Sequence, residues 1–172
     1  IVVMYTSIGG FVSVVRTDVL QGMLMLLGSM VIFYFVTRAA GGVGVITELR
    51  SLPDKAFLFE LNGGIPFAVL LGVSLSGALK LLADPRQLSR FYALKDDDAV
   101  RRGKWVATGG LTIVLVCLFP VGIYAHAILT DVTDTDLIVP LLVNDPAVFP
   151  IWATDFLIVS ILAAAMSSMD SV

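Results

Sequence analysis

Charge is what this sequence lacks most. Only 15% of its 172 residues are Asp, Glu, Lys or Arg, and 58% are hydrophobic, whereas soluble domains carry charge on about a quarter of their positions. With a mean hydropathy of +0.95, too few polar side chains remain to cover a water-soluble core. The composition therefore indicates a membrane protein. A net charge of −3 provides no basic face for nucleic acid, so no nucleic-acid partner is expected.

Cysteine and histidine are almost absent as well. The single cysteine, Cys117, excludes an internal disulfide, and the single histidine, His126, cannot form a Cys/His zinc cluster. The glycine pairs are not followed by the lysine that a phosphate-binding loop requires. These absences predict that the chain is not an enzyme.

Long uncharged runs take the place of these features. A membrane-spanning helix needs about 20 mostly apolar residues, because backbone groups in lipid must be paired within the segment. The runs predict one transmembrane domain fragment over residues 1–172, an all-α polytopic membrane protein that reads as an excerpt of a longer chain. The predicted spans are residues 1–15 (partial), 17–37, 61–82, 105–129 and 152–172 (partial). A turn is expected at Arg16–Asp18, and Pro66 predicts a kinked or broken helix in the third of these spans.

The loops between the spans differ in charge. Residues 80–104 carry seven of the eleven basic residues, whereas residues 131–155 carry no Lys or Arg and five Asp. Because Lys/Arg-rich short loops stay inside, we predict a cytoplasmic loop at 83–104 and extracytoplasmic loops at 38–60 and 130–151. Three basic residues in the first outer loop oppose this assignment mildly. The predicted location is the bacterial inner membrane or plasma membrane, with several passes through the lipid bilayer.

Two loop segments have a local signal of their own. ITELRSLPDKAF in the first outer loop mixes apolar and charged residues in the manner of a short amphipathic helix. The run Asp96-Asp97-Asp98 before Arg101 is typical of either a solvated loop or a helix start.

The last predicted helix holds the most informative residues, in LAAAMSSMDSV. Small side chains at Ala163–Ala165 allow another helix to approach closely, and Ser167 and Ser168 can present hydroxyl oxygens to a hard cation such as sodium. The competing interpretation is plain helix packing, with each serine bonded to a carbonyl one turn earlier. The residues alone leave both interpretations open.

Three stretches resemble the sodium:solute symporter family. AAAMSSMDS is similar to the family signature of paired alanines followed by Ser-Ser/Thr, a small or acidic residue and Ser. YTSIGGFVSVVRTDVLQGMLMLLG resembles the entry to the fifth core helix, and DPRQLSRFYALKDDDAVRRGKW resembles the loop after the sixth. The three occur in the family's order, and the resemblance covers the whole chain, from about core helix 4 to core helix 8.

The resemblance implies a fold and a site. The fold is part of a LeuT-like inverted-repeat core of ten helices. The Ala164 carbonyl and the Ser167 and Ser168 hydroxyls would supply half of a sodium site, with the other half on core helix 1. Asp18 would lie on the sodium exit route at the cytoplasmic mouth of core helix 5. A simpler role for Asp18 is that of a first-turn acid favoured by the helix dipole, and the two roles are compatible.

The function implied is a sodium-coupled secondary active transporter, or symporter, with Na+ as coupling ion and a small organic solute as partner. Two alternatives belong to other classes: a transporter-like membrane sensor domain of a histidine kinase, and a membrane scaffold or channel piece. Substrate-binding residues, the identity of the solute and the oligomeric state are not predicted.

Overall fold

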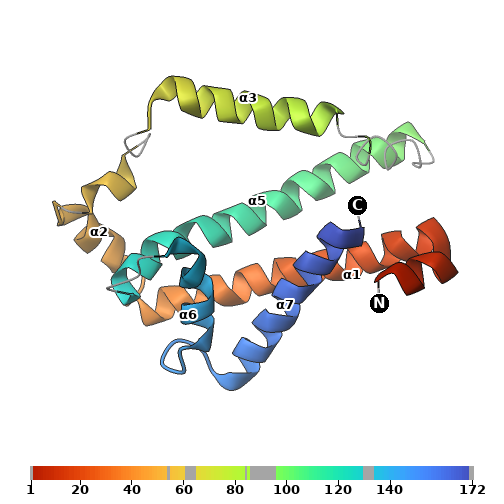
Figure 1. The fold of residues 1–172 in the computed structure, drawn as a ribbon. Helices are drawn as coiled ribbons and strands as arrows, with labels where there is room; N and C mark the ends of the chain where they lie inside the picture. Colours follow the sequence, from red (N-terminus) through yellow and green to blue (C-terminus); the bar gives the residue numbers. More distant parts are fainter. Residues whose placement is uncertain are drawn as a thin grey trace. The chain divides into compact units, whose positions relative to one another are not determined.

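The computed structural model describes residues 2–53, 55–60, 65–83, 85, 96–129 and 134–170. In this described part all regular elements are helices (Figure 1), which confirms the predicted all-α class there. The α-helices are α1 (Val2–Ala39), α2 (Gly44–Ser51), α3 (Phe67–Ala83), α5 (Asp97–Ile128), α6 (Ile138–Asn144) and α7 (Ile151–Asp170), and the 3₁₀ helices are η1 (Ala56–Phe59) and η2 (Thr135–Leu137).

Three of the described helices are long and apolar enough to cross a membrane. They comprise Ser13–Ala39 within α1, Asp97–Ile128, which is α5, and Ile151–Met169 within α7. The apolar part of α3, Phe67–Lys80, is shorter than a full span because a 30 Å hydrocarbon core requires about 20 residues. Three candidate spans in the described residues agree with the predicted polytopic membrane protein.

The turn predicted at Arg16–Asp18 is wrong, since these residues are helical and the interruption lies at Gly10. Gly10 has φ 60° and ψ −167°, a backbone conformation that glycine alone adopts readily. The polar residues do not end the helix, because the Thr17 hydroxyl donates to the Val14 carbonyl at 2.8 Å and the Ser13 carbonyl at 3.1 Å. The Thr17 hydroxyl is therefore paired within its own helix, and this position needs no turn.

The kinked or broken helix predicted over residues 61–82 stays a prediction, because the residues just before Ile65 are not among those the structure describes. Pro66 itself lies outside a helix. It precedes the first residue of α3, and its carbonyl accepts the amides of Val69 and Leu70 at 2.9 and 3.2 Å. A proline is favoured next to a helix start because its missing N–H is not needed there. Residues 61–64 of the predicted span lie outside the described residues.

The predicted cytoplasmic loop 83–104 is partly helical. Residues 84 and 86–95, with Arg86, Arg90 and Lys95, lie outside the described part, but α5 already begins at Asp97. The Asp96 carboxylate accepts the Ala99 amide at 2.7 Å, and Asp97 and Asp98 occupy the first turn. This is the N-cap arrangement that a helix dipole favours, and it confirms the helix-start interpretation of the aspartate run.

The predicted outer loops also contain helices. The first holds α2, in which Leu49 is buried while Glu48 and Arg50 are exposed, as expected of a short amphipathic helix. The second holds η2 and α6. Short helices in connections pair backbone groups that would otherwise need water. Residues 130–133 of this loop, with Asp131, lie outside the described residues.

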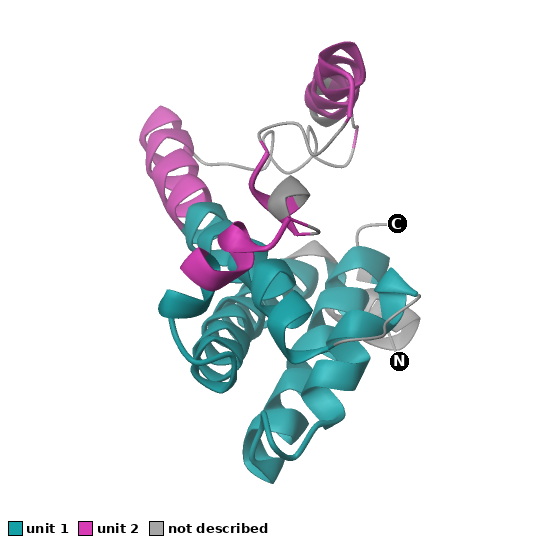
Figure 2. Cartoon of the chain, turned by 90° about the vertical axis from the view of Figure 1, so that its left-hand side faces the viewer, with its two compact units in different colours: residues 1–46, 110–172 teal, residues 47–109 magenta. Residues whose placement is uncertain are grey.

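The chain divides into two compact units, residues 1–46 with 110–172 and residues 47–109 (Figure 2). The first unit has a core drawn from four helices. Its members are Ile32 and Val36 of α1, Val121, Tyr124 and Ala125 of α5, Leu142 and Val143 of α6, Val148 and Phe149 of the following turn, and Ala153 and Leu157 of α7. Spacings of three or four residues put the α1, α5 and α7 members on one face of each helix, so the core fixes which faces of α1 and α7 meet.

Three further contacts secure α7 and the turn before it within the first unit. The Thr154 hydroxyl in its first turn donates to the Val143 carbonyl of α6 at 2.9 Å. The Phe35 ring of α1 lies 5.5 Å from the Phe149 ring and 5.7 Å from the Trp152 ring, centroid to centroid. These contacts sit at the end of the helix pair opposite Asp18 and Ser167.

Helices α1 and α7 approach each other closely at Gly28. A Cβ atom added to Gly28 would lie 2.8 Å from both Cβ and Oγ of Ser160, which is too short for any real contact. The two helix backbones therefore depend on a residue without a side chain at this crossing, as is common between membrane helices.

Candidate functional site

Helices α1 and α7 bring two of the predicted site residues together. The Ser167 hydroxyl donates to the Asp18 carboxylate with an Oγ–Oδ1 distance of 3.3 Å, although the residues are 149 positions apart. Both side chains are half-buried. A hydroxyl that donates its proton keeps its two lone pairs, so the Ser167 oxygen remains able to contact a cation while bonded to the carboxylate.

Ser168 and Ala164 meet within α7. The Ser168 hydroxyl donates to the Ala164 carbonyl at 3.1 Å, which is the internal bond expected of a packing serine. The same distance suits a shared cation, since two oxygens this far apart can both lie about 2.4 Å from one ion. The hydroxyl proton would then have to turn away from the carbonyl.

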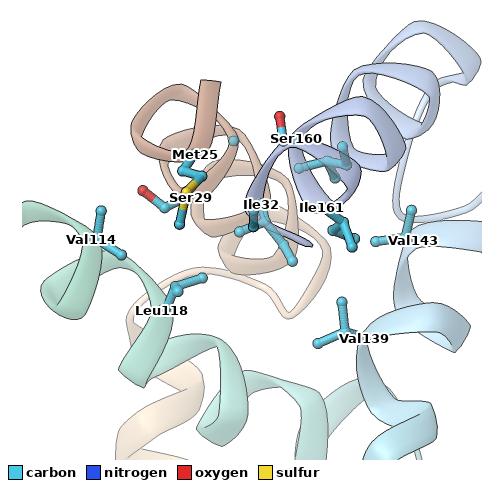
Figure 3. A pocket seen from close by; sticks show the side chains of 12 residues that line it. Met25, Ser29, Ile32, Val114, Leu118, Val139, Val143, Ser160 and Ile161 are labelled. Carbon is cyan, nitrogen blue, oxygen red and sulfur yellow. The ribbon is translucent and has the colours of Figure 1, made fainter. Parts of the chain in front are cut away.

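Ala164 also lines a cavity of about 260 Å³ in the first unit, the four-helix cavity. Figure 3 shows its walls, with side chains from α1, α5, α6 and α7. Its two hydroxyls are already used within their own helices, because Ser29 donates to the Leu26 carbonyl at 2.8 Å and Ser160 to the Phe156 carbonyl at 2.9 Å. The remaining walls are apolar, so we assign no solute-binding residue here.

A second cavity, of about 380 Å³, lies along the same helix pair, and we term it the Gln21 groove. It is lined by Thr17, Leu20, Gln21 and Leu24 of α1 and by Val159, Leu162, Ala163 and Met166 of α7. Gln21 is 6% exposed, and its Oε1 has no hydrogen-bond partner among the described residues. The sequence analysis did not identify this residue, because the direction that a glutamine faces cannot be read from an isolated apolar run.

The chemistry of the arrangement favours oxygen ligands. In the described part of the chain no three His, Cys, Asp or Glu side chains gather into a group that could hold a metal ion. The available groups are one carboxylate, two hydroxyls and a carbonyl, which suit a hard monovalent cation better than a transition metal. Of the four predicted site residues, the structure joins Asp18 to Ser167 and Ala164 to Ser168.

Comparison with known proteins gives several relatives. The chain is 28% identical to a sodium/pantothenate symporter of Haemophilus influenzae over 97% of this chain and 34% of the relative. It is 29% identical to the high-affinity proline transporter PutP of Bacillus subtilis over 99% of this chain and 36% of the relative. It is 27% identical to a sodium/proline symporter of Staphylococcus aureus over 99% of this chain and 33% of the relative. No solved structure matches the chain.

These relatives are much longer than the present sequence, which spans about a third of their length. They are nevertheless aligned with nearly all of it. The model of the sodium:solute symporter family matches residues 1–172, and membership of a symporter family agrees with the prediction that the chain is not an enzyme. The chain belongs to the sodium:solute symporter family.

Proposed function

We propose that this chain is part of a sodium-coupled symporter that imports a small organic solute across the cell membrane. The observation that carries the proposal is the family match over all 172 residues. The relatives named above, a sodium/pantothenate symporter and proline transporters, suggest the size and chemical class of the solute. The fold that accompanies this function is a LeuT-like inverted-repeat core.

Sodium is the coupling ion in this proposal, bound as a transported substrate and not as a resident cofactor. Its ligands on this chain are the Ala164 carbonyl and the Ser167 and Ser168 hydroxyls. The distance of 3.1 Å between the Ser168 and Ala164 oxygens supports a shared ion. Three oxygens are too few for a hard cation, which takes about six, so further ligands would come from segments outside these residues.

Asp18 has a second role in the proposal. Its carboxylate holds the Ser167 hydroxyl at 3.3 Å, so a sodium ion leaving Ser167 would meet a negative charge as its next partner. A carboxylate placed there lowers the free energy of a cation between the site and the cytoplasm. We therefore propose that Asp18 lies on the sodium exit route.

Coupling in such a transporter is thermodynamic. If sodium and solute stabilise the same conformation, each raises the affinity of the protein for the other by the same factor. The membrane potential contributes about 2.3 kcal/mol for each charge moved through 100 mV. The inward sodium gradient can thus drive solute uptake without any covalent chemistry.

The test is solute uptake against sodium concentration, in the full-length protein, for Ser167→Ala and Ser168→Ala. Loss of one charge-assisted contact, worth about 1.5–3 kcal/mol, should raise the half-saturating sodium concentration about ten- to hundredfold. Ser160→Ala is the matched control, because the Ser160 hydroxyl bonds only within α7 in the described structure. Unchanged half-saturation in both Ser167 and Ser168 variants would reject the sodium site and leave the packing role.

A further inference from the structure

The Gln21 groove contains a polar atom without a partner. Gln21 is only 6% exposed, and no described residue donates a hydrogen bond to its Oε1. Buried carbonyl oxygens are nearly always paired, because losing water without gaining a donor costs free energy. An acceptor in this position therefore indicates a donor that comes from elsewhere.

The groove itself offers no donor. Thr17 is its other polar residue, and its hydroxyl proton is directed to the Val14 and Ser13 carbonyls. The remaining lining side chains are Leu20, Leu24, Val159, Leu162, Ala163 and Met166. None of these six can donate a hydrogen bond.

The surroundings of the groove also limit which kind of molecule can supply the donor. Its rim is apolar and open, with Leu20 62%, Leu162 58% and Val159 50% exposed. Hydrocarbon chains of lipids have no donors. An apolar cavity holds water poorly, since an ordered water needs two to four polar partners. The occupant of the groove must cover an apolar rim and also carry a hydrogen-bond donor. A protein helix does both, because its apolar side chains cover the rim and one polar side chain reaches the Gln21 amide oxygen.

We propose that a membrane helix of the same polypeptide, outside residues 1–172, packs into the Gln21 groove and donates a hydrogen bond from a side-chain O–H or amide N–H to Gln21 Oε1. The chain spans only about a third of its relatives, so their remaining length includes segments able to fill it. Ala163 in the floor of the groove permits close approach of that helix. The proposal does not depend on sodium binding or transport.

The experiment uses the full-length protein with its cysteines removed, Cys117 included. Gln21→Cys is combined, one position at a time, with a cysteine replacing each Ser, Thr, Asn, Gln or Tyr in the membrane helices outside residues 1–172. Oxidation in native membranes should give one strong disulfide, in a band that migrates as a monomer, because linked Cα atoms must lie within about 7 Å. Met23→Cys, on the same helix but 63% exposed and outside the groove lining, should not link to that position.

Three results would overturn the proposal. A disulfide-linked dimer would assign the groove to a second copy of the protein. Labelling of Gln21→Cys by a membrane-impermeant thiol reagent, without any disulfide, would make the groove a water-filled space. Labelling of Gln21→Cys by a lipid-soluble maleimide alone would show that the groove faces lipid. If Gln21→Cys does not accumulate, Ala163→Cys across the same groove, with Gln21 retained, should link to the same helix and provides the same test.

Discussion

Asp18 illustrates how the tertiary structure gives a residue a partner that is far away in the sequence. On its own helix it is one polar residue beside Arg16 and Thr17, and the Thr17 hydroxyl bonds within α1. Across the helix pair, however, its carboxylate accepts the Ser167 hydroxyl. The charge of Asp18 is thereby held beside an oxygen of the proposed sodium site, so removing the charge should affect sodium before it affects the solute.

Asp18→Asn tests this in the full-length protein. Asparagine keeps an acceptor for Ser167 but loses the charge, so the half-saturating sodium concentration should rise about tenfold, which corresponds to about 1.4 kcal/mol. The ratio of uptake rates for competing solutes should stay unchanged. Uptake assays over a sodium series, with two solutes, measure both quantities. A changed solute preference with normal sodium dependence would contradict the assignment of Asp18 to the exit route.

At the scale of whole helices, the pairing of α1 with α7 includes a close approach at Gly28. Gly28 leaves no room for a Cβ beside Ser160, whereas Gly22, six residues earlier on the same helix, has nothing within 4 Å of the position of an added Cβ. The same chemical change therefore has opposite consequences at the two glycines. In the open position alanine only improves helix propensity, while at the crossing it forces the helices apart.

Gly28→Ala should destabilise the full-length protein by about 1–3 kcal/mol, the usual cost of overpacking. Gly22→Ala should be neutral or stabilising by up to about 1 kcal/mol. Thermal unfolding in detergent compares the two variants. Adding Ser160→Gly to Gly28→Ala should restore part of the loss, because it removes the atoms that the new methyl group meets. Equal effects of both alanine substitutions would show that the crossing is not tight.

At the scale of the molecule, the charge distribution predicts how the chain is oriented in the membrane. Lys104 and Trp105 lie near the start of α5, with the ammonium 5.5 Å from the ring centroid and the ring 68% exposed. Such a pair is typical of the membrane–water interface. The other end of α5 leads into an acidic segment, residues 131–155, without Lys or Arg. The positive-inside tendency then predicts that α5 runs from the cytoplasm outward.

Cysteine labelling tests this orientation at Asp97 and Asp136. Both side chains are exposed, and they are better sites than Asp96 and Asp134, whose carboxylates cap helix starts. Asp97→Cys should react with an impermeant thiol reagent only after cells are permeabilised, whereas Asp136→Cys should react in intact cells. Reaction of both variants after permeabilisation is the control for accessibility. The opposite pattern would invert the predicted topology.

Local properties of the chain were readable from the sequence. The lengths of the apolar runs predicted the helical class, because a backbone in lipid must pair its own groups. The aspartate run was typical of either a solvated loop or a helix start, and the Asp96 N-cap of α5 confirms the second interpretation. A short signature, together with two further stretches, predicted the family, which the match over residues 1–172 confirms. In each case neighbouring residues alone carry the signal.

Contacts between helices were decided only by the tertiary structure. Hydropathy does not say which face of an apolar helix meets another, so the Asp18–Ser167 bond, the Gly28–Ser160 crossing and the burial of Gln21 could not be predicted. The position of the break in α1 was also misjudged, since polar residues at Arg16–Asp18 looked like a turn while the backbone turned at Gly10. A helix tolerates polar side chains that bond to its own carbonyls. Where two such helices touch depends on side-chain shape on both partners, which a sequence read one segment at a time does not contain.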